Sequence, residues 1–172
     1  MTETEQSAVC EQVAGQRLPR WDELPDLELY MDQVLSLMER YLGAYPGFDR
    51  KGLTASMVNN YVKSGVMPAP VKKKYARAHL AHLIMICVLK TVFPIEQIKT
   101  LILASASEQD DRTGYNRFCD EFENALSRSA EDMSRSEGLS AIYRAALRAQ
   151  AEQALALRLY GAAFPPTEKG KK

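Results

Sequence analysis

Three consecutive lysines, Lys72–Lys74, follow two prolines in the stretch YVKSGVMPAPVKKKYARAHL (residues 61–80). Pro68 and Pro70 disfavour a helix and predict an extended loop, which we call the lysine loop (residues 66–75). A short loop has no room to bury three adjacent ammonium groups, so at least two of them face solvent. Ammonium groups bind phosphates as compact point charges. The loop therefore has the chemistry of a phosphate-binding element, and the alternative is an ordinary solvated loop between two helices.

Charge is segregated along the chain, although the formal net charge is +0 at pH 7. Residues 50–95 contain eight Lys or Arg and no Asp or Glu, so this segment carries +8 and the remaining chain −8. Such a concentration of positive charge is typical of proteins that bind anionic partners. The alternative is an intramolecular match between this basic segment and an acidic surface of the same chain.

A short polar helix is expected just before the lysine loop. Thr54 is a favoured N-cap residue, and Gly65 suits a left-handed C-terminal cap. Tyr61 shares the apolar face of this helix and is expected in the core. The opposite face carries four polar candidates for contact with DNA: Ser56, Asn59, Asn60 and Lys63. Asparagine side chains can donate to phosphates or pair with adenine edges, whereas a polar outer face without function is the alternative.

Arg77 begins the next expected helix, where its guanidinium has two possible environments. It either binds a phosphate beside Lys72, Lys73 and Lys74, or it only faces solvent. The helix itself is expected to run from Arg77 to Lys90 and to be buried, because its apolar stripe extends nearly all round.

Apolar residues recur at helical spacing through the rest of the chain, and no run alternates with the period of a strand. The sequence thus predicts an all-α fold. Helices are expected from just after Pro25 to Leu42, from Pro94 to about Ala104, around Tyr115–Leu126, and over residues 140–160, with a polar linker at 105–114 and a break at 134–138. Four parts are expected: a flexible N-terminal arm (1–25), a helix-turn-helix domain (26–104), a helical C-terminal extension (105–164) and a flexible tail (165–172).

The middle of the chain resembles the DNA-binding half of the MerR family. The matching pieces are Asn59-Asn60-Tyr61, Gly65-Val66, Lys74-Tyr75 and the segment PIEQIK at 94–99. The resemblance implies a winged helix-turn-helix in which residues 54–64 form the second helix and the lysine loop forms the wing. It also implies that the C-terminal region dimerises or senses a ligand.

The chain is more similar still to an uncharacterised bacterial family known only as a domain of unknown function, itself similar to MerR-type winged helices. The hallmark of that family, LTxxMVNNYVKxGxxPxPxKKxYxxxHLAxL, is present from Leu53 to Leu83. Three positions depart from the MerR pattern. Asn59 replaces the usual arginine, and Asn60 replaces the first tyrosine of the pair that follows it. Ala76 replaces the Ser or Thr that caps the next helix, a cap worth about 1 kcal/mol.

Enzymatic chemistry is not expected, because the chain has no phosphate-binding glycine loop, nucleophile elbow or zinc signature. His79 and His82 lie three residues apart without further ligands at suitable spacing, so we expect structural histidines, no metal and no cofactor. The three cysteines are widely separated, which favours a reducing cytoplasm over a disulfide framework. No apolar run is long enough to cross a membrane.

The sequence therefore predicts a cytoplasmic, bacterial-type transcriptional regulator that binds double-stranded DNA as a homodimer. The effector ligand is unknown, although Tyr115, Phe118 and Phe122 could line a small pocket or simply pack against neighbouring helices. The alternative function is a helical adaptor that presents the same basic patch to an acidic protein or to its own acidic half.

Overall fold

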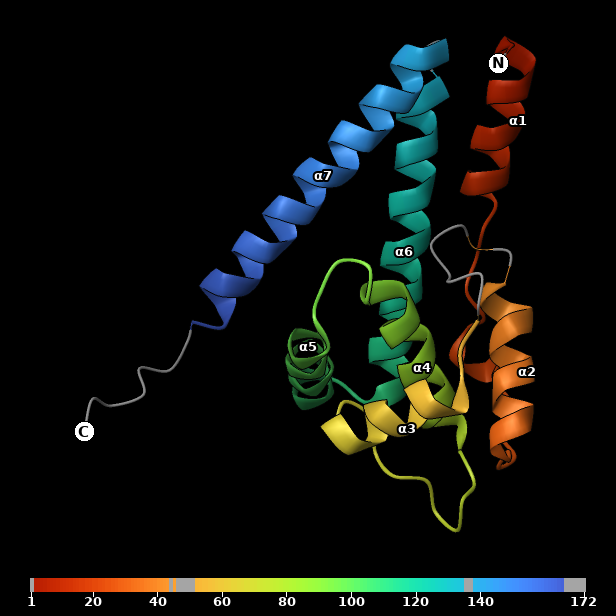
Figure 1. Ribbon diagram of the computed structural model, residues 1–172, viewed down its shortest axis with the longest axis vertical. Helices are drawn as coiled ribbons and strands as arrows, with labels where there is room; N and C mark the ends of the chain where they lie inside the picture. The colour runs from red at the N-terminus through yellow and green to blue at the C-terminus, as the bar shows by residue number, and fades with distance from the viewer. Residues whose placement is uncertain (1, 44, 46–51, 135–137, 166–172) are drawn as a thin grey trace.

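The computed structural model describes residues 2–43, 45, 52–134 and 138–165. Within these ranges it contains seven α-helices, one short 3-10 helix and no β-strand, which confirms the expected all-α class. The helices α2 (Met31–Leu42), α3 (Ala55–Ser64), α4 (Arg77–Leu89) and α5 (Ile95–Glu108) gather at one end of the molecule (Figure 1). The long helices α6 (Asp111–Ser134) and α7 (Gly138–Ala163) extend away from this end.

Helix α4 lies at the centre of these helices because it has no polar face that could be exposed to solvent. Its buried residues are His79, Leu80, Ala81, Leu83, Ile84, Ile86 and Cys87. Helices α2, α5 and α6 all contact α4 and cover it from different directions. A helix that is apolar all round is stable only when it is enclosed in this way.

Helix α3 is attached to α2 and α5 and has sharply defined ends. The hydroxyl of Thr54 accepts a hydrogen bond from the N–H of Met57 at 3.2 Å, so the predicted N-cap is confirmed. Gly65 ends the helix with a φ of 71°, the left-handed conformation expected for this cap. The ammonium group of Lys99 on α5 donates to the carbonyl oxygen of Ser64 at 2.8 Å and places a positive charge at the negative end of the helix.

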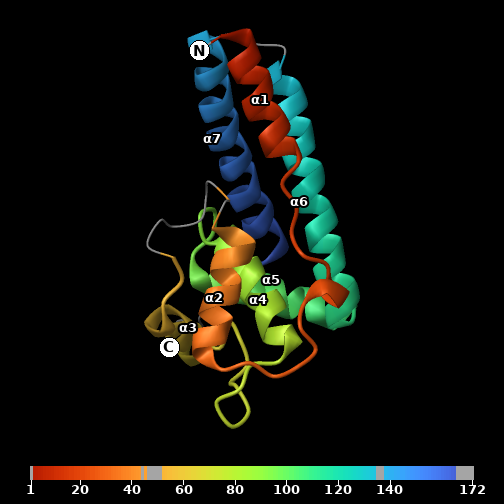
Figure 2. The same cartoon turned by 90° about the vertical axis from the view of Figure 1, so that its right-hand side faces the viewer.

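The N-terminal segment differs from the flexible arm that we expected over residues 1–25. It contains α1 (Glu3–Ala14), which packs along α6 (Figure 2), and the 3-10 helix η1 (Trp21–Glu23). A reciprocal capping box starts α1: Thr2 N–H donates to Glu5 Oε2 at 2.7 Å, and Glu5 N–H donates to the Thr2 hydroxyl at 3.2 Å. After α1, Leu18 and Leu24 are buried in the core. Docking on α6 therefore orders this segment.

The expected linker at 105–114 is also helical over most of its length. Helix α5 continues to Glu108 and α6 begins at Asp111, so the connection is two residues and the expected boundary at 104/105 falls inside α5. Asp110 makes this possible, because its carboxylate accepts bonds from the Thr113 N–H at 3.0 Å and hydroxyl at 2.8 Å. The centre of the expected 134–138 break and the tail from residue 166 lie outside the described residues.

Helix α2 begins later than expected, at Met31, because Leu29 pairs with Tyr75 in an extended conformation instead. Leu27 and Tyr30, which precede the helix, are exposed. None of the helices in the described part of the chain combines the length and apolarity needed to span a bilayer.

Replacing Gly65 with alanine is expected to lower the free energy of unfolding by about 1–2 kcal/mol, because a Cβ is strained at positive φ. Its nearest neighbour would be the Lys99 ammonium group at 3.1 Å, the mobile end of a long side chain, so backbone strain is the main cost. Urea unfolding measures the loss. Gly65→Asn is the matched control, because asparagine tolerates this conformation and the variant should lose less stability. Equal losses of stability in the two variants would assign the effect to the volume of the added side chain and not to backbone strain.

Candidate nucleic-acid interface

The exposed face of α3 carries the four residues that the sequence singled out on this helix. Ser56, Asn59, Asn60 and Lys63 are all exposed, while Val58 between them is fully buried. Tyr61 faces inward as expected, and burial raises the pKa of its phenol to about 12. The amphipathic pattern thus separates four polar side chains from the core and presents them together to solvent.

The lysine loop ends in a very tight hairpin. Val71 and Lys74 pair in antiparallel fashion, and the N–H of Lys74 donates to the carbonyl oxygen of Val71 at 2.9 Å. Lys72 and Lys73 make the turn between them, with φ values of 50° and 63°. Two consecutive left-handed residues define the two-residue turn that matches the twist of a hairpin, for which Asn-Gly is the favoured sequence.

This turn is strained because both of its residues carry long side chains. A residue other than glycine loses about 1–2 kcal/mol in the left-handed region, and asparagine or aspartate tolerates it better than lysine. Backbone strain of this kind is concentrated at functional sites. The lysine loop therefore holds two ammonium groups at its tip at a cost in stability.

The two tip lysines differ from the third one. Lys72 and Lys73 are exposed, and neither forms an ion pair with any described carboxylate. The ammonium group of Lys74 instead lies 3.8 Å from the carboxylate of Glu28 and 5.6 Å from the centre of the Tyr30 ring. At least two of the three lysines were expected to face solvent, and Lys72 and Lys73 are exposed while Lys74 is half-buried.

Arg77 does not simply face solvent, which was one of the two environments considered for it, and phosphate binding stays a prediction. Its guanidinium lies 3.8 Å from the carboxylate of Asp22, and its Nε donates to the carbonyl oxygen of Pro25 at 3.4 Å. The side chain is only 23% exposed. Both Asp22 and Glu28 precede α2, so the carboxylates that pair with Arg77 and Lys74 come from the N-terminal part of the chain.

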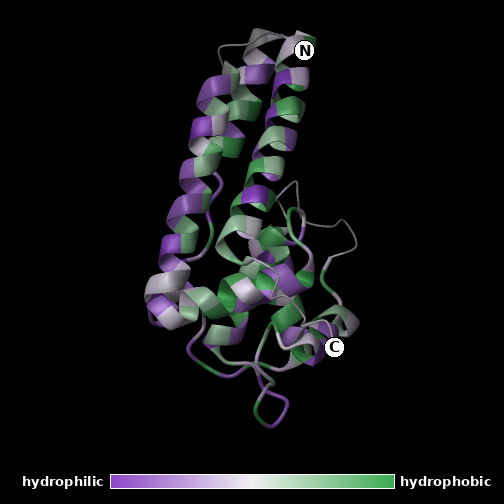
Figure 3. Ribbon diagram, turned by 90° about the vertical axis from the view of Figure 1, so that its left-hand side faces the viewer, coloured by the Kyte–Doolittle hydropathy of each residue, from purple (hydrophilic) through white to green (hydrophobic). Residues whose placement is uncertain are grey.

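Helix α3 and the lysine loop lie at the same end of the molecule, away from the tips of α1 and α6 (Figures 1 and 2). The loop projects beyond the helices and is partly hydrophilic in Figure 3. Its base is attached to the body by two hydrogen bonds between Leu29 and Tyr75, at 2.8 and 2.9 Å. The candidate interface therefore combines a polar helix face with a projecting, positively charged hairpin.

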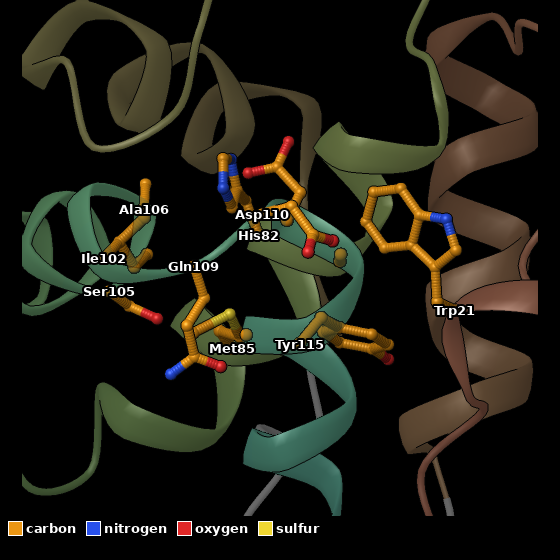
Figure 4. A pocket seen from close by; sticks show the side chains of 12 residues that line it. Trp21, His82, Met85, Ile102, Ser105, Ala106, Gln109, Asp110 and Tyr115 are labelled. Carbon is orange, nitrogen blue, oxygen red and sulfur yellow. The ribbon is translucent and has the colours of Figure 1, made fainter.

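A small cavity between α4, α5 and α6 contains His82 but offers no ligand set. Trp21, Tyr115, Asp110 and Gln109 also line it (Figure 4), and its volume is about 20 Å³, room for about one water molecule. Burial lowers the pKa of His82, and Asp111 opposes that effect. Among the described residues, no three His, Cys, Asp or Glu side chains are placed to hold a metal.

A family model described as "Domain of unknown function (DUF1836)" matches residues 19–122, which include η1 and α2–α5 and the first half of α6. No curated protein and no solved structure matches the chain. The expected domain-of-unknown-function family is thus confirmed, and the resemblance to MerR stays a prediction.

Replacing the tip with its favoured sequence, Lys72→Asn/Lys73→Gly, is expected to raise the free energy of unfolding by about 1 kcal/mol, because both residues then adopt positive φ readily. Urea or thermal unfolding checks this. The matched control, Lys72→Ala/Lys73→Ala, removes the same charges and keeps the backbone strain. An equal increase in the free energy of unfolding of both variants would show that the gain comes from relief of charge repulsion and not from relief of backbone strain.

Proposed function

The chain belongs to this DUF1836 family of unknown function, and we propose that it is a cytoplasmic DNA-binding transcriptional regulator. In this proposal α3 and the lysine loop form a winged helix-turn-helix similar to that of the MerR family. The observation that carries the proposal is the pairing of an exposed polar helix face with a hairpin tip whose Lys72 and Lys73 have no described acidic partner.

Helix α3 would enter the major groove, which accommodates a helix and displays a distinct donor and acceptor pattern for each base pair. Asn59 and Asn60 are the residues best suited to adenine edges there, because a carboxamide can donate and accept at once. Ser56 and Lys63 flank them on the same exposed face and would contact phosphates or bases.

The lysine loop would supply phosphate contacts and hence affinity. Lys72 and Lys73 are available without breaking any described contact. Lys74 and Arg77 would exchange Glu28 and Asp22 for phosphates. Both ion pairs are long, at 3.8 Å, and both carboxylates are exposed, so the exchange costs little.

One observation favours a second candidate, a helical adaptor for an acidic protein. The inner part of the basic surface already holds carboxylates, those of Glu28 and Asp22. A protein partner with acidic side chains could occupy the tip lysines in the same manner. DNA binding accounts in addition for the polar face of α3, which an acidic partner does not require.

The parent protein is expected to bind a random-sequence duplex at low salt, with a slope of log K against log salt of about −3.6 if about four phosphates are contacted. Lys72→Ala/Lys73→Ala should reduce the slope to about −1.8, because two phosphate contacts are lost. Fluorescence anisotropy at several salt concentrations measures both. Lys90→Ala is the control, since Lys90 lies beyond the opposite end of α4. No binding at low salt would favour the adaptor.

We also propose that the protein is a homodimer, and α7 is the surface that supports this. Only Ala141 is buried on the whole helix. Seven large apolar side chains of α7 are exposed: Leu139, Ile142, Tyr143, Leu147, Leu155, Leu157 and Leu159. Five of them follow one row of residues spaced by four, and such ridges pack into the grooves of a second, identical helix at about 50°. A second copy of the chain would thus cover this ridge.

Leu147→Glu is expected to convert the dimer to a monomer, because it places a charge in the middle of the apolar ridge. Sedimentation equilibrium measures the mass directly. Leu103→Glu, on α5, is the matched control: Leu103 is 58% exposed and Leu147 is 69% exposed, but Leu103 lies outside α7. A monomeric parent protein, or a dimer that survives Leu147→Glu, would refute the role of α7.

A further inference from the structure

The start of α4 is stabilised by a histidine in place of the missing cap. Ala76 occupies the N-cap position and has no side chain that can accept a hydrogen bond. Its own N–H donates to Nδ1 of His79 at 3.0 Å, which is the reciprocal half of a capping box, with histidine where glutamate is usual. His79 is 7% exposed, and its ring meets the edge of Tyr75 with centres 5.6 Å apart.

The other nitrogen of the same ring reaches the lysine loop. Nε2 of His79 lies 3.5 Å from the carbonyl oxygen of Ala69. Because Nδ1 accepts from Ala76, the single proton of the neutral ring is on Nε2, which therefore donates to Ala69. His79 thus joins the segment that enters the hairpin at Ala69 to the segment that leaves it at Ala76.

The two limbs of the hairpin are anchored unequally without this histidine. The outgoing limb is fixed by the two hydrogen bonds between Tyr75 and Leu29. The incoming limb contains Pro68 and Pro70, which have no N–H to donate. Between Met67 and Val71, the His79–Ala69 contact is the one hydrogen bond to the body that we find in the described part of the chain.

We propose that His79 is the positioning residue of the lysine loop, holding Lys72 and Lys73 in the DNA-contacting position through the contacts that its two ring nitrogens make with Ala76 and Ala69. The proposal rests on the proposed function, because it assigns the loop to DNA. Loss of both contacts would release the incoming limb of the hairpin, and DNA binding would weaken.

Two substitutions separate the hydrogen bonds of His79 from the space that its ring fills. His79→Gln keeps one acceptor for Ala76 and one donor for Ala69. His79→Leu fills the space with an apolar side chain and removes both bonds. Duplex affinity is measured by fluorescence anisotropy at low salt. His82→Gln controls for the other histidine, which lines the cavity of Figure 4 and does not contact the loop.

His79→Leu should bind the duplex about tenfold more weakly than the parent protein, the effect of losing about one hydrogen bond. His79→Gln and His82→Gln should bind about as well as the parent protein. Parent-like binding by His79→Leu, or binding by His79→Gln as weak as that by His79→Leu, overturns the proposal.

Limited trypsin digestion at about pH 8 tests the anchor without DNA. Cleavage after Lys72 and Lys73 should be faster in His79→Leu than in the parent or in His79→Gln. Thermal unfolding of each variant checks that the fold is intact. If the parent protein binds no duplex, the proposed function is refuted, and the digestion still tests whether His79 positions the loop. Equal cleavage rates in the parent and His79→Leu would refute the positioning role of His79, whatever the result with DNA.

Discussion

The enclosure of α4 is the constraint on which the rest of the structure depends. A helix with apolar residues on every side has to be covered on every side, and α2, α5 and α6 provide that cover. The lysine loop joins α4 at the N-terminal end of this helix. Arg77 and His79 lie in the first turn of α4, and Lys74 lies in the hairpin just before it. The candidate interface is therefore attached to a central, buried helix, and sites built on packed helices hold their geometry better than sites on loops.

Much of this arrangement was predictable because its causes are local in sequence. Thr54 and Gly65 mark the ends of α3 through caps that involve their immediate neighbours. The helical spacing of apolar and polar residues is enough to place Asn59 and Asn60 on the outer face of α3. Helix α1 could also have been recognised, since Thr2 and Glu5 have the spacing of a capping box, but its lack of an apolar stripe favoured disorder.

The remaining features arise from contacts between distant parts of the chain. The partners of Lys74 and Arg77, Glu28 and Asp22, are close to them only because Leu29 pairs with Tyr75. The left-handed turn at Lys72 and Lys73 has no sequence signal, because Asn-Gly is the pattern that predicts it. The pairing of Leu29 with Tyr75 and the tight antiparallel turn depend on tertiary contacts that no periodicity reveals.

Helix α7 contacts α6 and the turn between α4 and α5. Arg148 of α7 pairs with Asp132 of α6. Further along α7, the side-chain amide of Gln153 donates to the Thr91 carbonyl oxygen at 3.4 Å. The ring centres of Tyr160 and Phe93 lie 5.9 Å apart. Those last contacts fall on the turn between α4 and α5, and α5 in turn carries the lysine that closes the end of α3. A chain of contacts thus connects α7 through α5 to the C-terminal end of α3, at the opposite end of the molecule.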